Sequence, residues 1–155
     1  MIDARFGHVN LIARDWRRLA DFYERVFGCV FVPPERDLSG PVLEAGTGVI
    51  GATIRGAHLR LPGLGETGPT LEIFQYGTGP ESPGTAINRP GFGHIAFAVP
   101  DVAVAREMVL AEGGGVVGEV VTTGTSDGRR VTWTYLTDPE GNILELQSWS
   151  APVTG

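Results

Sequence analysis

Apolar and polar residues alternate along four short segments of the chain, and this alternation predicts four β-strands. Successive strand side chains point to opposite faces, so a period of two separates an apolar row from a polar one. The four segments are "FGHVNLIARD" from Phe6, "GPTLEIFQY" from Gly68, "FGHIAFAVPD" from Phe92 and "GNILELQSW" from Gly141. The segments "VIGATIRGAHLRLP" and "RRVTWTYLTDP" predict further strands before the second and the fourth of these.

Apolar residues at helical spacing predict one amphipathic helix after the first strand and another after the third. The helices are expected over Asp15–Gly28 and Asp101–Gly114. An aspartate at each start can accept hydrogen bonds from free helix N–H groups. A glycine at each end can take the left-handed conformation that stops a helix. The first helix is expected to pack in the core through one apolar face, made of Trp16, Leu19, Phe22, Tyr23 and Val26.

The chain repeats itself at an offset of 86 residues. Six residues are identical in this register: Phe6, Gly7, His8, Asp15, Gly28 and Val30 align with Phe92, Gly93, His94, Asp101, Gly114 and Val116. The period is far longer than that of a solenoid repeat, and it indicates one duplicated module packed as two halves.

The closing strands align at a shorter offset of 73, so the first half carries 13 extra residues, expected in loops near "PPERDLSGP" or "PGLGETGP". Each module reads βαβββ, which predicts an α+β fold with a curved mixed sheet. We expect a single domain over residues 1–155, made of module 1 (about 3–80) and module 2 (about 90–150). The segment "GTGPESPGTAINRPG" would connect them.

Composition narrows the class of protein. The chain is 42% hydrophobic and has a net charge of -6 without a basic cluster, which fits a folded domain and disfavours nucleic-acid binding. All 12 basic residues are arginine, so Schiff-base chemistry on lysine is excluded. Cys29, the one cysteine, is expected to be a small buried apolar residue. Without a membrane-spanning apolar run or a signal-peptide pattern, we expect a cytoplasmic protein that does not enter membranes.

Strand alternation places one histidine or glutamate of each of the four strands opposite the aliphatic, helix-facing row. These residues are His8, Glu72, His94 and Glu145. If the two modules pair symmetrically, one concave face gathers all four. Two imidazoles and two carboxylates are good ligands for a borderline divalent metal, and on a six-coordinate ion they leave two positions for substrate oxygens.

A structural role is the simpler interpretation of each residue taken singly. Histidines and glutamates on strands usually lie on the surface or have partners for all their hydrogen-bonding groups. The duplicated His–Glu pair on matching faces favours the metal interpretation. His58 has no counterpart in the repeat and lies in the arginine-flanked "RGAHLR", so we expect a structural or surface role for it. Five other residues share the faces of the candidate ligands and either pack or line a cavity: Asn10, Phe74, Tyr76, Gln147 and Trp149.

Together these segments resemble the vicinal oxygen chelate superfamily, which has the glyoxalase I fold. The resemblance covers essentially the whole chain, and its most specific part is "TDPEGNILELQSW". It implies two βαβββ modules with one divalent metal ion between them, and the family's metal positions map onto His8, Glu72, His94 and Glu145. Within the superfamily, "IRGAHLRLPG" followed by "TLEIFQY" is most similar to the branch of methylmalonyl-CoA epimerase and cyclitol-phosphate epimerases.

The resemblance implies a metal-dependent epimerase, isomerase or lyase that acts on a small oxo-, acyl- or cyclitol-type substrate. The divalent ion (Zn, Ni, Co, Mn, Mg or Fe) would act as a Lewis acid on a carbonyl oxygen and stabilise an enediolate. Glu72 and Glu145 would double as ligand and base, one on each side of the substrate plane.

Three alternatives stay open. An extradiol-type Fe(II) dioxygenase has a His₂Glu triad, and Glu72 would fill a position that the triad leaves free. Glutathione-dependent glyoxalase I is disfavoured because the chain shows no secure glutathione-anchoring residues. A metal-free drug-binding protein of the bleomycin resistance kind generally lacks the metal set. We expect a homodimer, with the site formed either within one chain or across the dimer.

Overall fold

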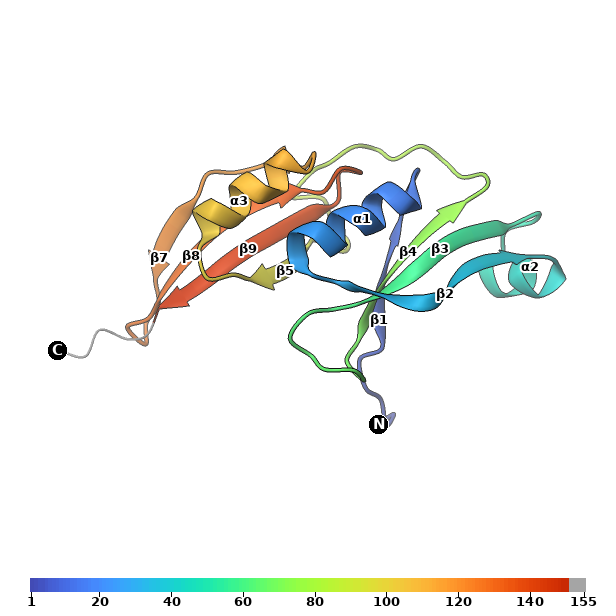
Figure 1. Ribbon diagram of the computed structural model, residues 1–155, viewed down its shortest axis with the longest axis horizontal. Helices are drawn as coiled ribbons and strands as arrows, with labels where there is room; N and C mark the ends of the chain where they lie inside the picture. Colours follow the sequence, from blue (N-terminus) through green and yellow to red (C-terminus); the bar gives the residue numbers. More distant parts are fainter. Residues whose placement is uncertain (151–155) are drawn as a thin grey trace. The chain divides into compact units, whose positions relative to one another are not determined.

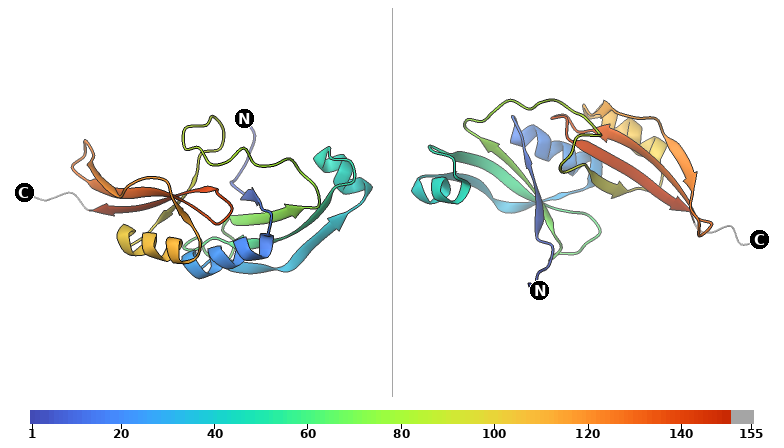
Figure 2. Two further views of the ribbon diagram at one scale, coloured as in Figure 1. Left: turned by 90° about the horizontal axis from the view of Figure 1, so that it is seen from above. Right: turned by 180° about the vertical axis from the view of Figure 1, so that it is seen from behind.

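The computed structural model describes residues 1–150, and the chain divides into two compact units. Unit 1 is Met1–Ser82, and unit 2 begins at Pro83. Each unit consists of one sheet with a helix across one of its faces (Figures 1 and 2). The α+β prediction is confirmed, because both units contain the βαβββ elements in order. A single domain over residues 1–155 stays a prediction, and its last five residues lie outside the described part of the chain.

Unit 1 contains β1 (His8–Ile12), α1 (Trp16–Phe27), β2 (Val30–Ser39), α2 (Pro41–Thr47), β3 (Thr53–Arg60) and β4 (Thr70–Tyr76). Its sheet has the order β1-β4-β3-β2. β1 runs parallel to β4, and the other neighbours are antiparallel. Helix α1 packs over β3 and β4, the two central strands.

Unit 2 contains β5 (Ile95–Ala98), α3 (Val102–Ala111), β6 (Gly115–Val116), β7 (Val121–Gly124), β8 (Arg130–Thr137) and β9 (Ile143–Ser150). The sheet has the order β5-β9-β8-β6, and β7 also pairs with β8. β5 runs parallel to β9, as β1 does to β4. The position that β2 occupies in unit 1 is therefore divided here between two short strands, β6 and β7.

The predicted apolar face of α1 forms the core of unit 1. Its central residues Leu19, Phe22 and Tyr23 are fully buried. The sheet contributes four fully buried residues from β3 and β4: Ala57, Leu59, Leu71 and Ile73. Complete burial of each large apolar side chain contributes about 1.5–3 kcal/mol, so this interface fixes the helix on the sheet.

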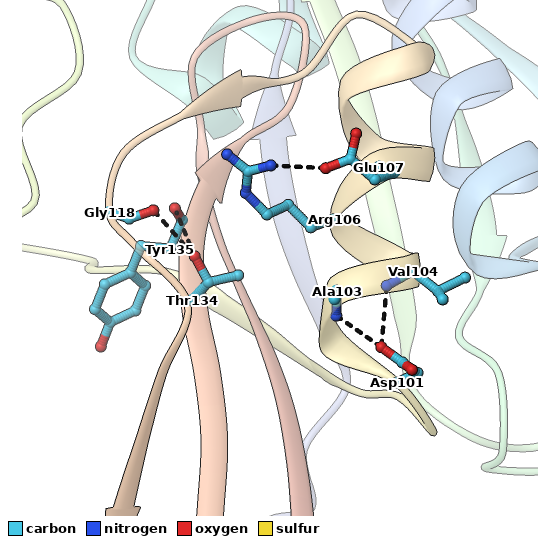
Figure 3. Close-up of polar contacts among 8 residues, drawn as sticks. All are labelled: Asp101, Ala103, Val104, Arg106, Glu107, Gly118, Thr134 and Tyr135. Atoms are coloured by element: carbon cyan, nitrogen blue, oxygen red, sulfur yellow. Dashed lines mark hydrogen bonds and ion pairs between the residues drawn. The ribbon is translucent and has the colours of Figure 1, made fainter.

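Both helices begin at the predicted aspartates. The Asp15 carboxylate accepts a hydrogen bond from the backbone N–H of Arg18 at 3.1 Å. The Asp101 carboxylate accepts from the backbone N–H groups of Ala103 and Val104, at 2.8 and 3.0 Å (Figure 3). In each module the cap therefore fixes where the chain turns from its first strand into the helix.

The two helices end differently, and the prediction for the second was wrong. Gly28 ends α1 with a left-handed φ of 68°. Helix α3 already stops at Ala111, and the left-handed glycine is Gly113, with a φ of 91°. Gly114 has another role: a Cβ placed there would lie 2.5 Å from the backbone oxygen of Thr137. Gly114 thus lets the chain approach β8 closely as β6 begins.

The extra residues of the first module form regular structure as well as loops. The segment "PPERDLS" belongs to β2 instead of a loop, and the pairing of β2 with β3 shifts between Val32 and Arg36. This shift accommodates Pro33 and Pro34, which lack the N–H group that a regular ladder needs. Helix α2 was not predicted. The loop between β3 and β4, 61–69, is longer than its counterpart 138–142, as the expected "PGLGETGP" insertion requires.

Among residues 1–150, no helix has the combination of length and apolar character that crossing a bilayer requires.

Candidate functional site

Each sheet has one face beneath its helix and one face that the helix leaves open. On β4, Leu71 and Ile73 are fully buried and Glu72 lies between them, so its side chain points to the open face. On β9, Leu144 and Leu146 are fully buried, and Glu145 between them is half-buried. Both glutamates therefore lie on the open face of their own sheet, in the predicted alternation.

In unit 1, His8 is the first residue of β1, and it contacts Glu72. The Nε2 atom of His8 lies 3.3 Å from Oε2 of Glu72. Asn10 is opposite Glu72 in the register of β1 and β4, and its Nδ2 atom donates to the same oxygen at 3.4 Å. The side chain of His8 is 51% exposed and that of Glu72 only 11%, so solvent reaches this pair from the histidine side.

His58 also contacts Glu72, from the opposite neighbouring strand. The two residues are paired in the register of β3 and β4, and Nε2 of His58 lies 3.0 Å from Oε1 of Glu72. Its ring packs against Phe74, with 5.8 Å between the ring centroids. Partial burial lowers the pKa of His58, against the opposing effect of the Glu72 carboxylate, so the ring is neutral near pH 7.

Unit 2 contains a similar pair. His94 lies immediately before β5, not within a strand as predicted. Its Nε2 atom lies 2.9 Å from Oε2 of Glu145 on β9. Tyr135 on β8 is opposite Glu145 in register, so its phenol faces that carboxylate. Burial and the negative charge of Glu145 raise the pKa of Tyr135, so the phenol stays protonated.

The repeat places His58 and Tyr135 at equivalent positions, because each faces the glutamate of the adjacent strand. Figure 3 shows the Tyr135 ring on the side of β8 away from α3, and its centroid lies 5.0 Å from that of His94. Neither residue was predicted from the sequence to belong to the site. His58 has no histidine counterpart, and the alternation in "VTWTYLT" was the only signal for Tyr135.

Within each unit, the His–Glu contact suits two ligands of one metal ion. Two donors about 2.1 Å from an ion lie about 3.0 Å apart in an octahedral arrangement and about 3.4 Å apart in a tetrahedral one. The separations between nitrogen and oxygen are 3.3 Å for His8 and Glu72, and 2.9 Å for His94 and Glu145. Imidazole nitrogen and carboxylate oxygen are also the donor types that borderline divalent ions accept.

Neither unit alone holds a complete ligand set. Among residues 1–150, no group of three or more His, Cys, Asp or Glu side chains is arranged to hold a metal ion. In unit 1, His8 and His58 contact different oxygens of Glu72. Each unit by itself therefore brings together two of the four predicted ligands.

Residues 5–146 match the family model of the Glyoxalase/Bleomycin resistance protein/Dioxygenase superfamily. The chain belongs to this superfamily. The resemblance seen in the sequence is thereby confirmed at the level of the superfamily, and the epimerase branch stays a prediction. No curated protein matches the sequence significantly.

Solved structures of superfamily members share the fold. A glyoxalase family protein from Bacillus cereus is 19% identical, with a TM-score of 0.78 over 97% of this chain and 99% of that one. A glyoxylase/bleomycin resistance protein/dioxygenase domain from Frankia sp. EAN1pec is also 19% identical, with a TM-score of 0.61 over 95% and 98%. A glyoxalase/bleomycin resistance protein/dioxygenase family enzyme from Burkholderia phytofirmans PsJN is 16% identical, with a TM-score of 0.54 over 94% and 98%.

Proposed function

We propose that the protein is a metal-dependent epimerase, isomerase or lyase that moves a proton on the carbon next to a carbonyl group. The observation that carries this proposal is the duplicated pair, with His8 lying 3.3 Å from Glu72 and His94 2.9 Å from Glu145. Both pairs lie on the open face of a sheet, where a small substrate can reach them.

His8, Glu72, His94 and Glu145 would together hold one divalent ion: zinc, nickel, cobalt, manganese, magnesium or iron. Two donors are too few for a tight site, so the proposal requires ligands from both units, within one chain or across a homodimer. When bound, the ion supplies Lewis-acid chemistry, which polarises a substrate carbonyl and makes the neighbouring C–H group more acidic.

The carboxylates of the protein would carry out the proton transfer. Glu72 and Glu145 come from different units, so one can accept the substrate's proton and the other can return one from the opposite side, as epimerisation requires. The Tyr135 phenol faces Glu145 from the neighbouring strand and would hold that carboxylate in place. A small oxo-, acyl- or cyclitol-type substrate would present the carbonyl group on which this chemistry depends.

Deuterium exchange tests the proposal. Metal-loaded wild-type protein in D₂O should introduce deuterium at the α-carbon of at least one member of a panel of 2-oxo acids, acyl-CoA thioesters and oxidised cyclitol phosphates. Glu72→Gln keeps an oxygen ligand but accepts no proton, so it should slow exchange by about 10²–10⁴-fold. Elemental analysis of the variant is the control that separates loss of the base from loss of the metal.

A wild-type rate in metal-loaded Glu72→Gln would leave Glu145 as the only base. The absence of exchange with every compound of the panel would contradict the proposed reaction class.

A further inference from the structure

We propose that His58 is a positioning residue that fixes the Glu72 carboxylate by holding one of its oxygens while the other faces His8. The inference rests on the proposed function, in which Glu72 is both a metal ligand and a base. It assigns a role to the one histidine of the chain that the ligand set does not use.

The contacts of Glu72 divide between its two oxygens. Oε1 lies 3.0 Å from Nε2 of His58. Oε2 lies 3.3 Å from Nε2 of His8 and accepts from Asn10 at 3.4 Å. Because both oxygens are engaged, the carboxylate plane cannot rotate freely, and Oε2 is kept on the side of His8, the histidine that the repeat pairs with His94.

His58 is itself rigidly placed. Its strand, β3, lies between β2 and β4, so it is hydrogen-bonded along both edges. The neighbouring residues Ala57 and Leu59 are fully buried beneath α1, and the imidazole packs on Phe74. A donor on a central strand is a firmer support for a ligand than one on a loop.

Comparison of the two units distinguishes a positioning role of His58 from a role as metal ligand. The candidate ligands are conserved between the two units as residue types, since His8 corresponds to His94 and Glu72 to Glu145. The counterpart of His58 is Tyr135, whose phenol faces Glu145 across the neighbouring strand. Imidazole and protonated phenol share the ability to donate to a carboxylate, whereas the phenol is a poor ligand. The property common to both units at this position is therefore the ability to donate, and an imidazole can donate from Nε2 in its neutral and its protonated form.

Cobalt binding measures this role without a substrate. Apo protein would be titrated with Co²⁺ and followed by visible absorption. His58→Phe keeps a ring against Phe74 but removes the donor, and it should weaken Co²⁺ binding by about 10–100-fold. His58→Gln restores an N–H donor at a similar reach without an imidazole ligand, so its affinity should lie within about threefold of the wild type. Arg55→Gln is the matched control on the same strand, because Arg55 is exposed, and its affinity should not change.

Each outcome decides between the two proposals. Wild-type affinity in His58→Phe would overturn the positioning role and leave the proposed function intact. Equal losses in His58→Phe and His58→Gln would show that His58 is a ligand, which also overturns the inference. A wild-type protein that binds no Co²⁺ would overturn the proposed function and, with it, this inference.

A second measurement needs no variant of His58. In ¹⁵N-histidine spectra of the metal-free wild type, His58 should have its proton on Nε2, and Glu72→Ala should shift that nitrogen's resonance. A neutral His58 with its proton on Nδ1 would contradict the proposed donation to Glu72 even if His58→Phe failed to fold.

Discussion

At the scale of single residues, the two candidate carboxylates differ in their surroundings although the repeat makes them equivalent. Glu72 contacts a ring nitrogen of His8, a ring nitrogen of His58 and the amide of Asn10, whereas Glu145 contacts a ring nitrogen of His94 and faces Tyr135. The four ligand candidates could be found from the sequence because strand alternation and duplication can both be recognised in the order of the residues. The supporting donors could not, since they depend on which residues face each other across neighbouring strands.

Cys29 gives a prediction at this scale. Its side chain is buried, and burial raises the pKa of the thiol to about 12. The thiolate is the reactive form, so native protein at pH 8 should react with a disulfide reagent far more slowly than protein unfolded in urea. The released chromophore measures the rate. Rapid stoichiometric reaction of the native protein would contradict the burial of this residue, which the sequence also predicted.

At the scale of elements, the sequence predicts a helix correctly where an apolar face and capping residues both mark it. Helix α1 has both a strongly apolar face and a terminal glycine, and it begins and ends as predicted. Helix α2 has no buried residue, and Val42 within it is 88% exposed, so no amphipathic period marked it in the sequence. The strand β2 runs through two prolines, which are ordinarily loop signals, because a shift in its pairing removes the need for their N–H groups.

Two glycines of unit 1 should respond oppositely to substitution by alanine. Gly28 has a φ of 68°, which an L-residue adopts at a cost, so Gly28→Ala should destabilise the unit by about 1–2 kcal/mol. Gly46 lies within α2 at negative φ, and an added Cβ would meet open space. Gly46→Ala should therefore stabilise by about 0.5–1 kcal/mol. Urea unfolding midpoints would measure both effects, and shifts in the same direction would contradict the assigned conformations.

At the scale of the whole molecule, duplication explains the architecture. The strand order β1-β4-β3-β2 in unit 1 corresponds to β5-β9-β8-β6 in unit 2, and each unit has its helix over the two central strands. Each unit presents one His–Glu pair on its open face, so the proposed four-ligand site would need residues of both. A homodimer and a cytoplasmic location stay predictions.

The metal content of purified protein and of two single variants tests the central claim most directly. Protein prepared without chelator should contain about one divalent ion per chain by elemental analysis, since four ligands complete one site. His8→Ala and His94→Ala lie in different units, yet each should lose most of the metal while keeping the fold. Loss of metal in only one of the two variants, two ions per wild-type chain, or no ion at all would contradict a single site shared by the two units.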